Sequence, residues 1–281
     1  MSDFRWPAPV GAGHQHIYPY TDGEPMNLVS WTVDRRVPEG RVRAGFTSRL
    51  GGVSASPFAS LNLGFHVGDH AESVHQNRQL LALEIGALPG WMDQVHGTCI
   101  GQARPGETLE RTDGLILAEP HLVPAHAPST EAACVMVADC VPLLLVRSDA
   151  PAAAAVHVGR AGFMGGIVGV AISKLGRPER VTAIIGPSIC GNCYEVPEPM
   201  REESRRIEEA AASNTSWGTP SIDIPAGIHA QLSSLGVADV INTGICTRES
   251  PDFFSYRRAS QTANKTGRFI GIVQVFRDTP S

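Results

Sequence analysis

Residues 134–146 read CVMVADCVPLLLV, two apolar runs that are separated by the polar pair Asp139-Cys140. A second stretch, AAAAVHVG at residues 152–159, is another apolar run that leads to a polar residue and a glycine. Continuous apolar runs of this length are typical of strands that are buried on both faces. We therefore expect interior strands at Cys134–Val137, Leu143–Val146 and Ala153–Val158, with helices packed on the sheet faces.

The remainder of the chain alternates between β-like and helical patterns. Further strands are predicted at Leu28–Thr32, Val42–Thr47, Gly114–Ala118, Val181–Ile185, Val237–Asn242 and Phe269–Val275. Helices are predicted at Glu72–Leu83, Gly162–Leu175, Glu198–Ala212 and Pro225–Leu235. Residues 1–27 are expected to form a loosely ordered leader, and residues 119–132 a surface loop. Because no long polar linker follows, residues 28–281 are expected to form one domain of the mixed α/β (α+β) class.

Composition argues against two large classes of protein. The 23 basic and 28 acidic side chains give a formal charge of -5, whereas proteins that bind nucleic acids usually carry a basic stripe. No run reaches the roughly 18 apolar residues that a membrane span needs, and the first residues lack the features of a signal peptide. We expect a cytoplasmic protein whose six cysteines form no disulfide framework.

Three segments place a residue that can bind a metal at the end of a strand-like run. They are QVHG with His96, ADCVP with Cys140, and AVHVG with His157. Two histidines and a cysteine, with one position left for water, are the ligand count of a catalytic zinc site. Such a set can also hold copper, and a Cys–His pair can instead act as nucleophile and base. Taken singly, each residue is more often structural, so the residues alone leave these alternatives open.

Eight blocks of the sequence follow the order of a known family. They are FTSRLGGVS (46–54), SLNLG (60–64), GD with V..NR (68–78), QVHG (94–97), TDGLI (112–116), ADCVPLLL (138–145), GPSICGNCYEV (186–196) and FFSYRR with TGR (253–268). The chain thus resembles the YfiH-type multicopper polyphenol oxidoreductase (laccase-like) family over most of residues 42–275. The resemblance implies one YfiH-like catalytic domain, with central sheets covered by helices in a layered α/β/β/α sandwich.

The resemblance also implies a metal site and an activity. It assigns His96, Cys140 and His157 as ligands of zinc, with copper as the alternative metal. The implied activity is on purine nucleosides: phosphorolysis of adenosine, inosine, guanosine and methylthioadenosine with phosphate as co-substrate, together with adenosine deamination. No nucleic-acid or membrane partner is implied.

Three other functions stay open from the sequence. The family has also been viewed as a cysteine hydrolase or amidase acting on cell-wall precursors, with Cys140 as nucleophile and His157 as base. Its name suggests a copper-dependent polyphenol oxidase, but such enzymes need a histidine-rich trinuclear cluster, and the ten histidines include one His-x-His pair, His14-Gln15-His16. A metal-dependent interaction protein is the alternative without catalysis.

Candidate substrate-binding residues lie in the blocks around the trio. Arg49 precedes a Gly-Gly turn and can present its guanidinium and nearby backbone N–H groups to an anion. Consecutive side chains on an extended strand point to opposite faces, so at most one arginine of the pair at 257–258 should face the pocket, and Arg258 is the candidate. Asn62 and Gln94 are candidate contacts for ribose or base. Asp139 is a candidate to orient a ligand or to act as acid or base in catalysis.

Two further blocks need interpretation: one departs from the family motif, and the other contains a CxxC pair. Where the family has HAGWRG, this chain has HVGRAG, so Arg160 occupies the Trp position and Ala161 the Arg position. Arg160 is therefore the candidate anion-binding residue of this block, displaced by one position. Cys190 and Cys193 resemble a redox pair, but the family's own YEV sequence follows them, which favours a structural or peripheral role.

Overall fold

The computed structural model describes residues 27–117, 130–262 and 265–278. The predicted leader, apart from its last residue, and most of the predicted loop at 119–132 lie outside these ranges. Residues 130–132 of that loop were predicted wrongly, because they begin a strand.

Two sheets form the centre of the molecule. The first is antiparallel, with the order β1-β2-β14-β7, and consists of β1 (Val29–Val37), β2 (Gly40–Thr47), β7 (Thr130–Val137) and β14 (Phe269–Arg277). The second has the order β13-β10-β8-β9-β6-β4. Its strands are β4 (Ile100–Gln102), β6 (Gly114–Leu117), β8 (Val141–Arg147), β9 (Ala153–Val158), β10 (Val181–Ile185) and β13 (Asp239–Asn242).

The strand β8 shows why its sequence is apolar throughout. Leu144 and Val146 pack into the core between the two sheets, whereas Leu143 and Leu145 pack into a second core on the outer face of their sheet. Successive side chains of a strand point to opposite faces, so both faces of this strand are buried.

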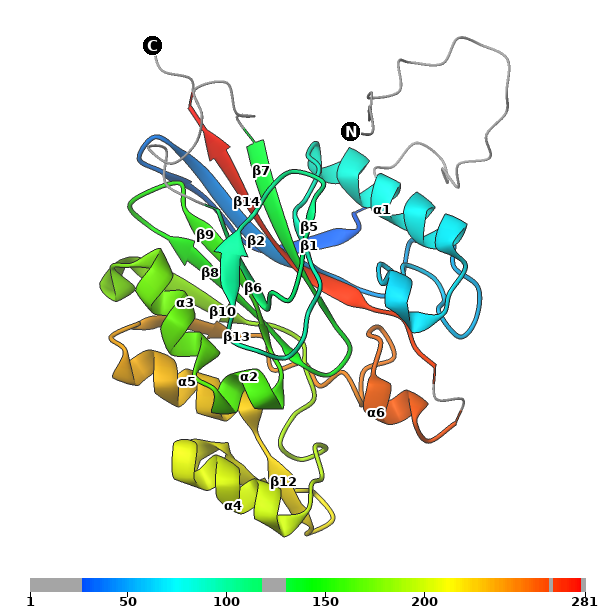
Figure 1. The fold of residues 1–281 in the computed structure, drawn as a ribbon, viewed down its shortest axis with the longest axis vertical. Coiled ribbons are helices and arrows are strands. Elements are labelled where there is room, and N and C mark those ends of the chain that lie inside the picture. The colour runs from blue at the N-terminus through cyan, green and yellow to red at the C-terminus, as the bar shows by residue number, and fades with distance from the viewer. Residues whose placement is uncertain (1–26, 118–129, 263–264, 279–281) are drawn as a thin grey trace.

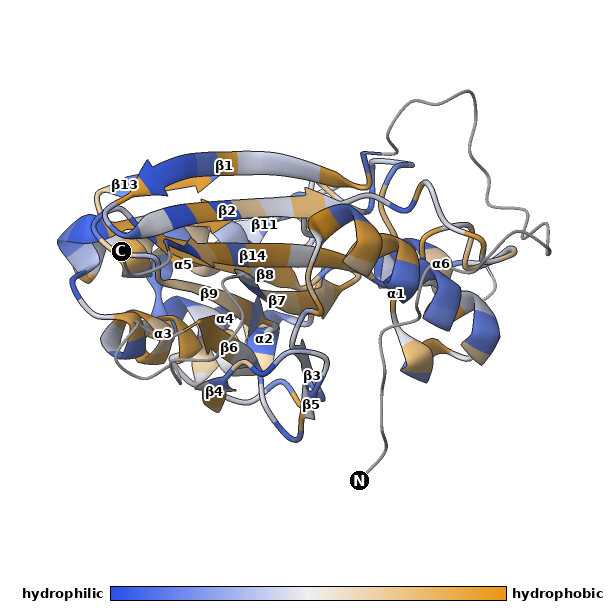
Figure 2. Ribbon diagram, turned by 90° about the horizontal axis from the view of Figure 1, so that it is seen from above, coloured by the Kyte–Doolittle hydropathy of each residue, from blue (hydrophilic) through white to orange (hydrophobic). Residues whose placement is uncertain are grey.

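Helices cover the two outer faces of the sheet pair (Figure 1). Helix α1 (Ala71–Ile85) packs Leu81 and Ile85 onto the four-stranded sheet. Helices α2 (Arg160–Met164), α3 (Ile167–Leu175) and α5 (Ile224–Ser234) lie on the other side and pack onto the six-stranded sheet. Figure 2 shows the apolar sheet interior and the polar residues of α1. The predicted layered α/β/β/α sandwich of the mixed α/β class is confirmed.

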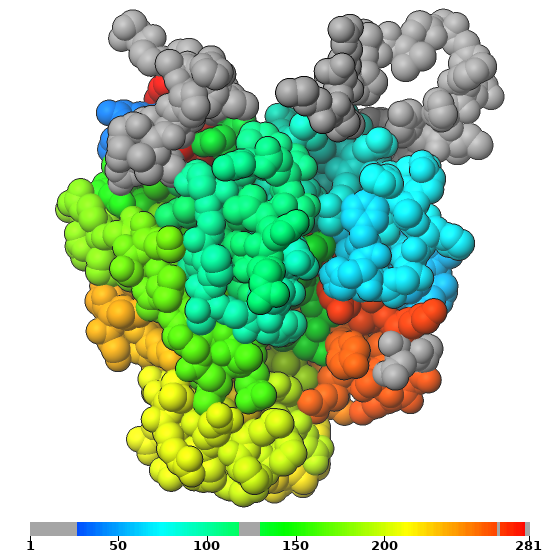
Figure 3. Space-filling view, in the orientation of Figure 1, coloured from blue at the N-terminus to red at the C-terminus, as the bar shows by residue number. Residues whose placement is uncertain are grey.

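Smaller elements complete the described chain. Short strand pairs join β3 (Trp91–Met92) to β5 (Thr108–Leu109) and β11 (Ala212–Asn214) to β12 (Pro220–Ile222). Helix α4 (Glu198–Ile207) lies in the yellow lobe at the lower end in Figure 3, and α6 (Tyr256–Ala259) lies in the orange-red region on the right of the same view. Three 3-10 turns occupy Phe65–Val67, Pro178–Arg180 and Glu209–Ala211. In the described part of the chain, no helix is long and apolar enough to span a membrane.

Two predicted helices have the wrong extent. The predicted helix Gly162–Leu175 is two helices, because Gly165 and Gly166 separate them and Gly166 adopts a left-handed φ of +84°. The predicted helix Glu198–Ala212 ends at Ile207, where Glu208 turns to an extended conformation before the 3-10 turn.

Candidate functional site

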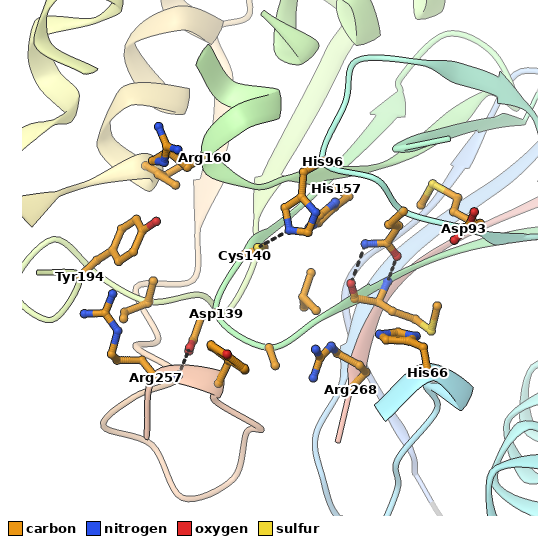
Figure 4. A pocket seen from close by; sticks show the side chains of 18 residues that line it. His66, Asp93, His96, Asp139, Cys140, His157, Arg160, Tyr194, Arg257 and Arg268 are labelled. Carbon is orange, nitrogen blue, oxygen red and sulfur yellow. Dashed lines mark hydrogen bonds between the residues drawn. The ribbon is translucent and has the colours of Figure 1, made fainter. Parts of the chain in front are cut away.

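His96, Cys140 and His157 come together at one end of the six-stranded sheet. Strands β8 and β9 pair antiparallel with Pro142 opposite His157, which brings Cys140, in the turn before β8, beside that histidine. His96 approaches from the loop that follows β3. The three donor atoms lie within 4.8 Å of one another, with 3.8 Å between Cys140 Sγ and His96 Nε2 (Figure 4). His157 is buried and His96 is exposed, so the cluster opens towards solvent.

A buried carboxylate, Asp113, holds both histidines in place. Its Oδ1 atom is hydrogen-bonded to His157 Nδ1 at 2.8 Å and accepts the backbone N–H of His96 at 2.9 Å. Its Oδ2 atom accepts the N–H of Gly97 at 2.7 Å, so the loop is fixed although His96 has a φ of +61°. Because Nδ1 of His157 is engaged, its Nε2 is the atom available to a metal. The sequence contained Asp113 in the TDGLI block, but no role was predicted for it.

Gly159 makes the close approach of the trio sterically feasible. A Cβ atom at this position would lie 2.6 Å from His96 Cδ2 and 3.4 Å from Cys140 Sγ. The first distance is far below van der Waals contact, so any side chain here would displace the imidazole. Gly159, two residues after His157 in the sequence, is therefore part of the architecture of the site.

The trio has the protonation chemistry of a metal site. Burial alone would raise the pKa of the Cys140 thiol, but His157 and His96 outweigh it and lower that pKa to about 6. Burial opposes protonation of His157, but Cys140 and Asp113 outweigh it and raise the pKa of His157 to about 9. A thiolate therefore forms readily at neutral pH, and a cation can replace the proton that this pair shares. A His2Cys set with one open side fits zinc.

The trio lines a pocket of about 560 Å³, within the usual size range of small-molecule sites. Arg160, Tyr194 and Arg257 lie on one side of the pocket, and Arg268 and His66 lie on the other (Figure 4). Burial lowers the pKa of Arg268, but a guanidinium stays charged at neutral pH. The pocket therefore combines the metal-ligating trio with three positive groups.

Three further residues predicted from the sequence, Asp139, Gln94 and Arg160, line this pocket. The carboxylate of Asp139 is already engaged: Oδ1 accepts from Thr247 Oγ1 at 2.7 Å and Oδ2 from the N–H of Arg257 at 2.6 Å. Gln94 donates to the carbonyl of Met136 at 2.8 Å and accepts its N–H at 2.9 Å. Asp139 and Gln94 thus fix neighbouring backbone at the pocket wall.

Arg49, Asn62 and Arg258 do not line the pocket. Arg49 donates to the carbonyl of Ala59 at 2.7 Å and stacks over the ring of Phe254. The buried Asn62 accepts the N–H of Arg268 at 2.9 Å, so it supports the pocket wall indirectly.

Arg258 lies in helix α6, not in the extended strand that was expected. Its guanidinium donates to the carbonyls of Thr247, Arg248, Ser250 and Phe253. The neighbouring Arg257 lines the pocket instead, as do Tyr194, Tyr256 and Arg268, which the prediction omitted. Arg257 lies in the FFSYRR block and Arg268 in the TGR block, so the family blocks could have identified both as pocket residues.

The fold and the cluster define a layered α/β protein with a candidate metal centre in a ligand pocket. The chain belongs to the family described as "Multi-copper polyphenol oxidoreductase laccase", whose model matches residues 43–276. The family resemblance found in the sequence blocks is thereby confirmed.

Named relatives and solved structures are similar over most of the chain. A purine nucleoside phosphorylase of Streptomyces coelicolor is 46% identical over 239 residues, which is 82% of this chain and 93% of that protein. One of Mycobacterium tuberculosis is 42% identical over 243 residues, 83% of this chain and 92% of that protein. The Neisseria meningitidis protein NMB0706 superposes with a TM-score of 0.74 at 28% identity, covering 89% of this chain and 99% of that one. Bacillus licheniformis YfiH gives a TM-score of 0.70 at 27% identity, covering 86% and 98%.

Proposed function

We propose that this chain is a metal-dependent purine nucleoside phosphorylase that acts in the pocket of His96, Cys140 and His157. Relatives that bear the name purine nucleoside phosphorylase align over more than four-fifths of the chain. The observation that carries the proposal is the pocket itself, which combines a metal-ligating trio with three guanidinium groups. Phosphorolysis needs a site for a phosphate anion beside a site for the nucleoside, and guanidinium groups are well suited to phosphate.

The arginines of the pocket are assigned to phosphate. Arg160, at the position where the family has Trp, lines the pocket, so the displaced guanidinium can still contact an anion there. Arg257 and Arg268 approach from the C-terminal segments, and the backbone that carries them is fixed by Asp139 and Asn62 respectively. Phosphate held by these groups would displace the base from ribose, and its negative charge would stabilise the positive charge that builds on the sugar.

His96, Cys140 and His157 would hold the metal, and Asp113 would fix the two histidines. When bound, zinc would act as a Lewis acid that polarises an oxygen atom or lowers the pKa of a water molecule. Because a His2Cys set leaves a position for water, adenosine deamination is proposed as a second activity of the same pocket. Adenosine, inosine, guanosine and methylthioadenosine are the proposed substrates.

One observation favours a different reaction. Cys140 could act as nucleophile, His157 as base and Asp113 as the carboxylate that orients the base. The pKa of Cys140 is lowered to about 6. That arrangement suits a cysteine hydrolase or amidase. A multicopper polyphenol oxidase is less well supported, because among the described residues only one of the two candidate metal-binding groups contains histidine.

Product assays with defined metal content separate these functions. The purified chain is analysed for zinc and copper and then incubated with adenosine, with and without phosphate. Adenine that appears only with phosphate supports phosphorolysis, and inosine formed without phosphate supports deamination. If the metal-loaded protein gives neither product, the proposal fails. A chelator should abolish activity and added zinc should restore it, whereas a thiol hydrolase would keep its activity.

Cys140→Ala provides the matching genetic test. Loss of a ligand should remove the metal from the trio and lower turnover of adenosine by more than about 100-fold, since loss of an outer-shell partner alone costs about 10–100-fold. Cys99→Ser is the control, because Cys99 is an exposed cysteine that belongs to neither candidate metal group. If Cys140→Ala keeps both metal and activity, Cys140 is not a ligand.

A further inference from the structure

A second donor cluster lies outside the trio and takes no part in the proposed function. The sulfur atoms of Cys190, Cys193 and Cys246 and a carboxylate oxygen of Glu249 lie within 4.8 Å of one another. Cys193 and Cys246 are buried, Cys190 is half-buried and Glu249 is exposed. The four donors come from two chain segments that are far apart in sequence.

The backbone brings these two segments together in register. In the first segment, the N–H of Cys193 donates to the carbonyl of Cys190 at 3.0 Å, a turn that carries both sulfurs of the CxxC sequence. In the second, the N–H of Glu249 donates to the carbonyl of Cys246 at 3.2 Å. A parallel bridge between Ser188 and Cys246 holds the two turns against each other. The convergence of four donors is therefore built by backbone contacts.

We propose that Cys190, Cys193, Cys246 and Glu249 bind a structural zinc ion. Structural zinc sites are four-coordinate and closed, are rich in cysteine, and commonly include a pair of cysteines with two residues between them. A disulfide would use two of the three sulfurs and would leave the third thiol and the carboxylate unexplained. One zinc ion accounts for all four groups.

The charges around the cluster agree with a bound cation. Three thiolates and one carboxylate would exceed the charge of one zinc ion. Arg248 Nη1 lies 3.5 Å from Cys193 Sγ and would offset part of this excess.

The cluster braces the wall of the pocket. Ile189 and Tyr194, which flank the CxxC turn, line the pocket, and the N–H of Ile189 donates to the carbonyl of Asp139 at 3.0 Å. From the other segment, Thr247 donates to the carboxylate of Asp139 at 2.7 Å. A zinc ion that joins these segments would thus hold two partners of Asp139, Ile189 and Thr247, in place.

The experiment measures zinc by elemental analysis in the full chain purified without chelators, in the wild type and in three variants. Cys193→Ser should lose one zinc per chain relative to wild type and keep the metal of the trio. His96→Ala should show the reverse, retaining the zinc of the second cluster. Cys99→Ser should match the wild type. Equal zinc in Cys193→Ser and wild type would overturn the proposal.

Two further measurements test the site if Cys193→Ser folds poorly, and test whether two of the cysteines instead form a disulfide. Glu249→Gln changes an exposed side chain, and it should release one zinc at least about 10-fold faster to a chelator. An unchanged release rate would overturn the four-residue ligand set. Thiol titration of the wild type after denaturation with a chelator should count all six cysteines. A count lower by two would show a disulfide and overturn the zinc site.

Discussion

At the scale of single residues, the site depends on groups that do not touch a substrate. Asp113 accepts hydrogen bonds from both histidine segments, and Gly159 leaves room for the imidazole of His96. Each has a purely local effect, but together they determine whether His96 and His157 can share one ion with Cys140. Metal sites generally require such support, because ligands must be held to within a fraction of an ångström.

Gly159→Ala should therefore weaken the trio. The new methyl group would lie 2.6 Å from His96 Cδ2, so we expect the trio to lose metal and nucleoside turnover to fall by at least about 10-fold. Zinc content and turnover are measured on the folded protein. Gly169→Ala is the control: its Cβ meets nothing within 4 Å in helix α3, so it should retain activity and gain about 0.5–1 kcal/mol of stability. Equal activity of the two variants would show that His96 is not constrained by Gly159.

At the scale of elements, short helix α6 determines which arginine reaches the pocket. Ser255 caps the helix by accepting the N–H of Arg258, and Asp139 accepts the N–H of Arg257. Because the segment is helical, the two side chains diverge: Arg257 enters the pocket, and Arg258 turns back to the carbonyls of the 247–253 loop. One side chain faces the pocket and the other braces the loop.

Substitution of each arginine by alanine should separate these roles. Arg257→Ala should raise the KM for phosphate by about 10-fold, the effect of losing one charge-assisted hydrogen bond of about 1.4 kcal/mol. It should lower Tm less than Arg258→Ala does, because its guanidinium donates to one exposed carbonyl, that of Glu195. Arg258→Ala should lower the free energy of unfolding by about 2 kcal/mol, because it leaves several loop carbonyls without their donor. Steady-state kinetics and urea unfolding test both. Exchanged effects would contradict the assignment of Arg257 to the pocket.

Features that leave a direct local pattern in the sequence were predicted more closely than features that depend on long-range contacts. The apolar runs located strands β8, β9 and β10 closely, since burial on both faces leaves a direct pattern. The break at Gly165-Gly166 was missed because the apolar pattern continues across it. The trio was suggested by its place at the ends of strand-like runs and assigned from the ordered family blocks, whereas its proximity depends on the pairing of β8 with β9, a long-range contact. The direction of Arg258 was missed because an extended strand was assumed where the chain is helical.

At the scale of the whole molecule, the pocket depends on two sheets staying packed together. Met136 and Val137 of the four-stranded sheet and His157 of the six-stranded sheet line the same cavity. The core between the sheets contains Leu144 and Phe46, both buried. Stability of this core is therefore a condition for the site to exist, and its members Met92, Val137 and Ala138 also line the cavity.

Leu144→Ala tests this dependence against a matched leucine. Leu144 is fully buried between the sheets, so its truncation should cost about 2–5 kcal/mol of unfolding free energy. Leu83→Ala removes the same atoms from a side chain that is 59% exposed on α1, and it should change that free energy by less than about 0.5 kcal/mol. Both are measured by urea unfolding. At low denaturant the folded Leu144→Ala protein should keep its metal, because the trio is held by Asp113 and Gly159; metal loss from that folded protein would show that inter-sheet packing sets the site geometry directly.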